Sequence, residues 1–112
     1  MLDSGARQLS RELALAILII DDERRIRRFL CMALEGLGCR TLEAGTGEAG
    51  LNLVETQHPD LVLLDLGLPD RDGIEVARSI REHSRVPILV ISARTHEQSK
   101  AQAFAAGWTT TW

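Results

Sequence analysis

Apolar segments that alternate with amphipathic ones constrain the fold of this 112-residue chain more than any other feature of its sequence. Residues 15–20 and 87–91 are apolar, and residues 60–65 are apolar between Asp60 and Asp65, as expected of parallel strands that are covered on both faces. Residues 40–44 form a shorter and more mixed segment, which is typical of a strand nearer the edge of a sheet. The repeated order of strand and helix predicts an α/β domain built on a doubly wound parallel sheet.

The segments between these strands carry apolar side chains at intervals of three and four, which is the spacing of an amphipathic helix. We expect helices over residues 24–37, 48–57, 73–82 and 96–106. The first helix is expected to turn six apolar residues toward the sheet: Ile26, Phe29, Leu30, Ala33, Leu34 and Leu37. Its arginines are expected on the opposite face, and Gly38 ends it. The fifth strand and helix of a usual doubly wound domain are expected to be missing.

Composition and charge exclude several classes of function. An apolar content of 45% is enough for one core and one domain. The net charge of −3 and pI of 5.6 do not provide the basic surface of a protein that binds nucleic acid or an anionic membrane. The longest apolar run, residues 13–20, is far shorter than the roughly 20 residues of a membrane span, so the protein is predicted to be cytoplasmic. Cys31 and Cys39 are interpreted as small core residues rather than disulfide partners.

Acidic and hydroxyl side chains follow three of the predicted strands. Asp21 and Asp22 come after the first strand, Asp65 ends the third, and Ser92 with Ala93 follows the fourth. Ligands of an open parallel sheet sit beyond the carboxyl ends of its strands, so we expect these residues to converge. Clustered carboxylates repel one another unless a cation neutralises them, and an all-oxygen site suits Mg²⁺. An aspartate beside such an ion can accept a phosphoryl group, which makes Asp65 the predicted nucleophile.

Residues 17–107 resemble the receiver domain of bacterial two-component response regulators in three motifs, IIDDE, DLVLLDLGLPDRDG and PILVISAR. The stretches RRFL, DLGLPD and ISAR are most similar to regulators of potassium-uptake operons, within the subfamily that carries a winged-helix DNA-binding domain. The resemblance implies a flavodoxin-like sheet of order 2-1-3-4. It also implies a signalling domain rather than an enzyme, which takes a phosphoryl group from a sensor histidine kinase with Mg²⁺ as cofactor.

The resemblance assigns roles to single residues. It implies that Asp22 and Asp65 bind Mg²⁺ directly together with the carbonyl of Gly67, and that Asp21 acts largely through water. It implies that Ser92 binds a phosphoryl oxygen and moves toward it when the domain switches. It further implies that two residues shape the loop after Asp65: Pro69 and Gly73.

Each of these residues also has a plainer interpretation. Asp21 and Asp22 suit the N-terminus of the first helix, where carboxylates are favourable without any metal. The arginines of the first helix suit a solvated face, although the family's kinases dock near this helix. Residues 45–50, GTGEAG, match the GxGxxG pattern of dinucleotide-binding proteins, so a dinucleotide-binding fragment is a remote alternative. That alternative leaves the aspartates unexplained.

The chain departs from the family pattern at both ends. Residues 1–14 form a leader longer than usual. Two hypotheses explain it equally well: a false translation start upstream of the true one, and a functional extension. The tail AAGWTTTW replaces a family segment with a lysine that pairs with the phosphoryl group, and Lys100 cannot replace it by position. Restoring one lost G in a plausible coding sequence turns residues 108–112 into Val-Asp-Asp-Tyr-Leu, so we interpret them as a frameshifted tail.

This departure sets an alternative to the leading function. We expect the domain, over residues 15–107, to be incomplete and therefore marginally stable or prone to aggregate, because net stabilities are only about 5 to 15 kcal/mol. We also expect the family's dimerisation face to be impaired, with no DNA or membrane contact by this chain. The alternative is thus an inactive, truncated receiver product without a working switch.

Overall fold

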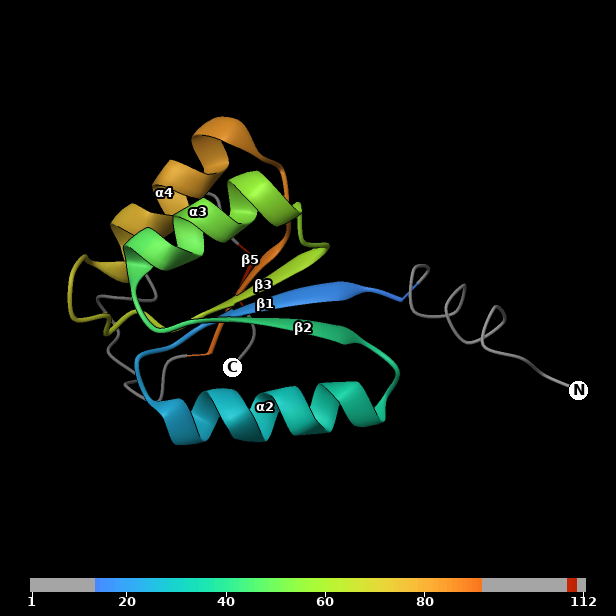
Figure 1. Cartoon of the computed structure of the whole chain (residues 1–112). Coiled ribbons are helices and arrows are strands. Elements are labelled where there is room, and N and C mark those ends of the chain that lie inside the picture. The colour runs from blue at the N-terminus through green and yellow to red at the C-terminus, as the bar shows by residue number, and fades with distance from the viewer. Residues whose placement is uncertain (1–13, 92–108, 111–112) are drawn as a thin grey trace, which may run out of the picture.

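The computed structural model describes residues 14–91 and 109–110, in which a sheet lies between helices (Figure 1). Its elements follow one another in this order: β1 (Ala16–Ile20), α2 (Arg24–Gly36), β2 (Arg40–Ala44), α3 (Gly47–Gln57), β3 (Leu61–Leu64), α4 (Gly73–His83), β4 (Ile88–Val90) and β5 (Thr109–Thr110). The predicted strands and the first three predicted helices agree with these bounds within one or two residues. The helix predicted over residues 96–106 lies outside the described residues.

The sheet is parallel, with the strand order β2-β1-β3-β4-β5. The predicted class and the order 2-1-3-4 are therefore confirmed. The prediction that a fifth strand is missing is wrong in one respect, because Thr109 and Thr110 pair with Leu89 and Val90 of β4. Two β-branched residues are enough to occupy backbone groups on the outer edge of β4 over this short length.

Among the residues that the structure describes, α2 lies on one face of the sheet and α3 and α4 lie on the other (Figure 1). Successive side chains of a strand point to opposite faces, so β1, β3 and β4 contribute to both cores. In β4, Ile88 and Val90 belong to the core beneath α3 and α4, whereas Leu89, with Ile91 just after the strand, packs against the core on the α2 face. The central strand β1 is buried over its whole length, as its apolar sequence predicts.

The inward face of α2 differs from the predicted one. Phe29, Ala33 and Leu37 were expected to face the sheet, yet all three are exposed. The helix is rotated so that Cys31 is buried, with 5% of its surface exposed, and so that Arg27 lies inward as well. Arg27 can take this position because it finds polar partners there: the carbonyl oxygen of Asp21 and the carboxylate of Glu43. The expectation that every arginine of this helix faces away from the sheet is therefore wrong for Arg27.

Two predictions about the covalent and membrane state of the chain can be compared with the described residues. Cys31 and Cys39 are free thiols, one buried and one half-buried, which agrees with their interpretation as core residues. Within the part of the chain that the structure describes, no helix has the length and apolar character required to cross a membrane.

Candidate metal centre

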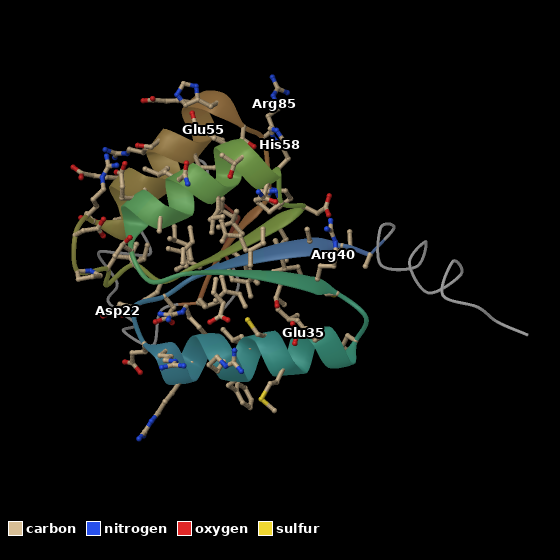
Figure 2. The ribbon with its side chains drawn as sticks, in the orientation of Figure 1. Asp22, Glu35, Arg40, Glu55, His58 and Arg85 are labelled. Carbon is tan, nitrogen blue, oxygen red and sulfur yellow. The ribbon has the colours of Figure 1, made fainter. Side chains whose placement is uncertain are left out.

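Three carboxylates converge at the carboxyl edge of the sheet. Asp21 and Asp22 follow β1, and Asp65 follows β3, which pairs with β1 in parallel. The backbone N–H of Asp65 donates a 2.8 Å hydrogen bond to the carbonyl of Ile20, which brings the two strand ends together. One carboxylate oxygen from each of the three aspartates lies within 4.8 Å of the others. The expected convergence is therefore found for these three residues, and Figure 2 shows Asp22 at the N-terminal end of α2.

Asp21 is the buried member of the group, with only 3% of its surface exposed. Its Oδ1 accepts a 2.8 Å hydrogen bond from the backbone N–H of Glu23. Burial raises the pKa of Asp21 above its ordinary value; the Glu23 hydrogen bond opposes this effect, and repulsion from Asp65 and Asp22 adds to it. An ionised Asp21 is therefore costly here unless a cation neutralises it.

The plainer interpretation of Asp21 and Asp22 as helix caps does not fit α2. The residue at the N-cap position of this helix is Glu23, and its side chain makes no capping hydrogen bond. No acidic residue lies in the first turn of the helix, which begins with Arg24 and Arg25. The two aspartates thus precede the N-cap position, and Asp21 bonds to the N–H of Glu23 rather than to the first turn of the helix.

Asp65 is half-buried, and its surroundings are set by the loop that leads to α4. Its Oδ1 accepts a 3.3 Å hydrogen bond from the backbone N–H of Gly67. Gly73 packs against the start of the same loop, because a Cβ there would lie 2.5 Å from the Cα of Leu66 and 2.9 Å from the carbonyl oxygen of Asp65. Pro69 is exposed in this loop. A side chain at position 73 would therefore displace the backbone next to Asp65.

The carboxylates line a small hollow of about 80 Å³. Its lining consists of Asp21, Asp22, Glu23, Ile26, Asp65, Gly67 and Ile91. The polar side chains of this set offer oxygen atoms only, with no nitrogen or sulfur ligand. Hard divalent cations prefer oxygen, and Mg²⁺ in particular uses few carboxylates and keeps several waters. The donor set and the buried Asp21 carboxylate thus fit Mg²⁺.

Some predicted site residues cannot be compared with this geometry. Ser92, Ala93 and Lys100 lie outside the described residues. Ile91, the residue immediately before Ser92, lines the acidic hollow. The chain therefore approaches the site at the point where the sequence predicts the hydroxyl.

Asp70 has a role that sequence reasoning missed. Its two carboxylate oxygens accept hydrogen bonds of 2.8 Å and 3.1 Å from the backbone N–H groups of Gly47 and Glu48, in the first turn of α3. The bond from Gly47 is the main cause that holds the pKa of Asp70 below its ordinary value. The sequence offered two weak signals for this contact: an acidic residue in a loop and a helix that begins in GTG. Asp70 and Gly47 are 23 positions apart, so nothing in the sequence linked them.

The same contacts explain the GxGxxG pattern without a dinucleotide. A Cβ at Gly47 would lie 2.6 Å from Val76, and one at Gly50 would lie 2.5 Å from Ile20, so both glycines allow close packing. In dinucleotide-binding proteins the pyrophosphate accepts hydrogen bonds from the amides at this helix N-terminus. Here Asp70 already occupies the amides of Gly47 and Glu48.

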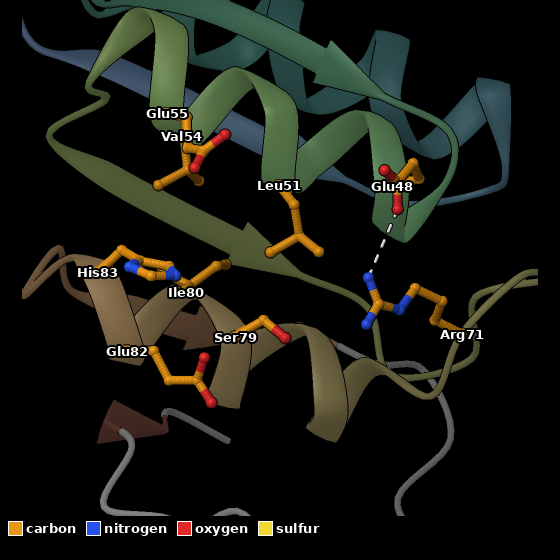
Figure 3. Close-up of a pocket in the computed structure, with 9 residues that line it drawn as sticks. All are labelled: Glu48, Leu51, Val54, Glu55, Arg71, Ser79, Ile80, Glu82 and His83. Carbon is orange, nitrogen blue, oxygen red and sulfur yellow. Dashed lines mark hydrogen bonds and ion pairs between the residues drawn. The ribbon is translucent and has the colours of Figure 1, made fainter.

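A larger hollow of about 270 Å³ lies between α3 and α4 (Figure 3). Leu51, Val54 and Ile80 form its apolar part, and an ion pair of 3.5 Å joins Arg71 to Glu48 at one end. Its polar residues are partly or fully exposed and do not converge on a common point. The smaller acidic hollow is therefore the better candidate site, despite its size.

Comparison with known proteins shows the family to which the chain belongs. Residues 17–111 match the family model described as the response regulator receiver domain. The chain is 54% identical over 91 residues to the KDP operon transcriptional regulatory protein KdpE of Escherichia coli, covering 81% of this chain and 40% of the relative. It is 42% identical to the transcriptional regulatory protein SrrA of Staphylococcus aureus, covering 81% and 38%. The chain thus spans about 40% of the length of the curated relatives it matches.

Solved structures give the same result for the fold. The chemotaxis protein CheY4 of Vibrio cholerae superposes with a TM-score of 0.81 at 25% identity, over 87% of this chain and 83% of that one. The BeF3-activated receiver domain of RstA from Klebsiella pneumoniae superposes equally well, at 21% identity, over 85% and 81%. The expected likeness to receiver domains, and to regulators of potassium-uptake operons among them, is confirmed.

Proposed function

The chain belongs to the response regulator receiver domain family, and from this premise we propose that it accepts a phosphoryl group on Asp65 in a two-component phosphorelay. The observation that carries the proposal is the convergence of Asp21, Asp22 and Asp65 within 4.8 Å at one edge of the sheet. The family is a signalling one, so the proposed reaction modifies the domain itself rather than an external substrate.

The proposed metal ligands are Asp22, Asp65 and the carbonyl of Gly67, with Asp21 acting largely through water. Two features support this assignment: the oxygen-only donor set of the hollow, and the burial of Asp21, whose charge needs a cation. When bound, Mg²⁺ supplies positive charge that stabilises the phosphoryl oxygens during transfer.

In the proposed reaction one carboxylate oxygen of Asp65 attacks the phosphorus atom of a phosphohistidine. A phosphorus–oxygen bond forms while the phosphorus–nitrogen bond breaks, and the leaving imidazole keeps the electron pair and takes up a proton. The N–H of Gly67, now 3.3 Å from Asp65 Oδ1, keeps the carboxylate oriented toward the hollow. Ser92, followed by Ala93, is the proposed donor of a hydrogen bond to a phosphoryl oxygen.

The donor is proposed to be a sensor histidine kinase in the cytoplasm, by membership of the family. The complete relatives are transcriptional regulators, and this chain matches only about 40% of their length. Regulation of transcription is therefore proposed for a complete protein of this kind, while residues 15–107 carry the receiver function. We propose no contact of this chain itself with nucleic acid.

Intact-mass measurement after incubation with acetyl phosphate and Mg²⁺ tests the proposal directly. The expected result is a gain of one phosphoryl group that Asp65→Asn abolishes and that EDTA prevents. Asp60→Asn is a matched control, since Asp60 lies at the opposite edge of the sheet and accepts a 2.8 Å hydrogen bond from Ala16 that an asparagine can keep. No gain in a folded, soluble sample would overturn the proposal in favour of an inactive receiver product.

A further inference from the structure

Arg27 has an unusual position for an arginine on an amphipathic helix. It points toward the sheet, and only 17% of its side chain is exposed. The neighbouring Arg28 is 63% exposed, although it also approaches Glu43, at 3.8 Å. The burial of Arg27 therefore needs a reason that does not apply to Arg28, because taking a guanidinium out of water is costly unless its hydrogen bonds are replaced.

The partners of Arg27 supply that reason. Its Nη1 donates a 2.7 Å hydrogen bond to the backbone carbonyl of Asp21, and its Nε lies 3.2 Å from Oε1 of Glu43 on β2. The backbone N–H of Asp21 donates in turn to the carbonyl of Ala44, at 3.0 Å. Together with the bond from Glu23 N to Asp21 Oδ1, these contacts hold the backbone N–H, the carbonyl and the carboxylate of Asp21.

Gly45 completes the surroundings of the guanidinium. A Cβ at this position would lie 3.2 Å from Nη1 of Arg27, which is tighter than an ordinary contact. The φ angle of Gly45 is not in the left-handed region, so an alanine there can keep the backbone conformation. The first glycine of the GxGxxG pattern thus leaves room for Arg27.

We propose that Arg27 is a positioning residue for the metal centre, which orients the Asp21–Asp22 segment through its hydrogen bond to the carbonyl of Asp21. The inference rests on the proposed function, because it concerns how the site holds its ion. Arg27 touches neither ion nor phosphoryl group in this scheme; it acts on the backbone from which two of the three carboxylates project. Residues that orient metal ligands typically change metal affinity about 10-fold to 100-fold when they are replaced.

An arginine suits this task better than a lysine. The planar guanidinium presents several N–H groups in a fixed arrangement, so it can bind the Asp21 carbonyl and the Glu43 carboxylate at once. A lysine ammonium is a compact charge on a flexible stem and cannot reproduce that geometry. Arg27→Lys therefore keeps the positive charge near the site but loses the orientation of the backbone.

The test measures Mn²⁺ binding by electron paramagnetic resonance, with Mn²⁺ alone as the probe, and the melting temperature of each metal-free sample. Arg27→Lys is expected to weaken Mn²⁺ binding about 10-fold. Gly45→Ala, which changes no charge, is expected to weaken it in the same direction by a smaller factor. Arg28→Lys, the same substitution one residue away, is expected to leave the affinity within about twofold, since Arg28 is 63% exposed and its ion pair is with Glu43.

The outcomes separate this inference from the proposed function. If Arg27→Lys binds Mn²⁺ as tightly as the unsubstituted chain, the inference is overturned, even where the melting temperature falls, because Arg27 is then a structural residue only. Equal weakening in Arg28→Lys overturns it as well, since general charge is then the cause. If Arg27→Lys does not fold, unchanged affinity in Gly45→Ala decides against the inference. Absence of Mn²⁺ binding by the unsubstituted chain overturns the proposed metal site itself.

Discussion

The two faces of the sheet are built from the same strands but packed to different depths. Beneath α3 and α4, side chains such as Ile80, Ile88 and Val90 are at most 1% exposed. On the α2 face, Ile17 and Ile19 of the central strand are buried as well, whereas Leu89 and Ile91 on the β4 side are only half-buried. Since strand residues alternate between the faces, both faces draw on the same strands, and the difference concerns the β4 side of the sheet. The described helix on this face, α2, contacts β1 and β2.

Small residues and polar contacts set the distance of each helix from the sheet. On the deeper face, Gly50 lets α3 approach Ile20 directly. On the other face, α2 buries Cys31 and holds Arg27 between helix and sheet, while Phe29 and Met32 are each 70% exposed. Apolar packing thus accounts for one face, and the other combines an apolar core with specific polar contacts of Arg27. The acidic hollow is lined by Asp22, Glu23 and Ile26 at the N-terminal end of α2, next to the polar contacts of Arg27.

The largest expected effect is the loss of unfolding free energy when a cavity is created in the core of each face. Ile80→Ala, beneath α4, is expected to lower the free energy of unfolding by about 2 to 5 kcal/mol. Leu34→Ala, on the half-buried inner side of α2, is expected to cost about half as much or less, because less apolar surface is lost. Urea unfolding followed by circular dichroism measures both. Equal losses would show that the two faces contribute alike, contrary to the packing.

A second prediction uses the opposite pKa directions of Asp21 and Asp70. The pKa of Asp21 is raised, mainly by burial, so its contribution favours the folded state fully below the ordinary value of 3.8 and is lost as the pH rises through the raised pKa. The pKa of Asp70 is lowered, mainly by the Gly47 hydrogen bond, so its contribution is present above 3.8 and is lost as the pH falls through the lowered pKa.

Melting temperatures without metal check these signs. At pH 7, Asp21→Asn is expected to raise the melting temperature by a few degrees, whereas Asp70→Asn is expected to lower it by a few degrees. Both differences should shrink as the pH approaches 3. Excess Mg²⁺ should reverse the sign for Asp21→Asn only, because the ion stabilises the ionised carboxylate. A destabilised Asp21→Asn protein in EDTA at pH 7 would contradict the assigned cost of burying that charge.

The smallest expected effect concerns the outer surface of α2. Met32→Gln is expected to change the free energy of unfolding by less than about 0.5 kcal/mol, because this side chain is 70% exposed and buries little apolar area. Urea unfolding again measures the effect, with Leu34→Ala as the comparison on the inner side of the same helix. A loss as large as that of Leu34→Ala would mean that α2 packs through its outer side as well.

The sheet could be predicted well because strands that are buried on both faces require continuous apolar runs, which are visible in the sequence. The run at residues 16–20 is apolar throughout, and every one of its residues is buried. The acidic site could be predicted from the same runs, because Asp21, Asp22 and Asp65 come directly after them. A residue directly after a parallel strand lies at the carboxyl end of the sheet, and this can be predicted without knowledge of the side-chain packing.

What could not be predicted depends on contacts between distant parts of the chain. On α2, residues spaced by three and four can form either of two neighbouring inward faces, one that contains Phe29 and one that contains Arg27. The hydrogen bond of Arg27 to Glu43 on β2 favours the face with Arg27. The bonds of Asp70 to the first turn of α3 also join segments far apart in the sequence. Thr109 and Thr110 form a strand without an apolar run, because pairing with β4 supplies their hydrogen bonds.

The loop between β3 and α4 is fixed at both ends, and this has a consequence for how its length can vary. Asp65 belongs to the acidic hollow at one end, and near the other end Asp70 holds the first turn of α3. Surface loops usually tolerate insertions and deletions among homologues. In this loop, the gain or loss of a single residue between Asp65 and Asp70 would release one of the two attachments, so functional relatives are expected to differ there in residue type and not in length.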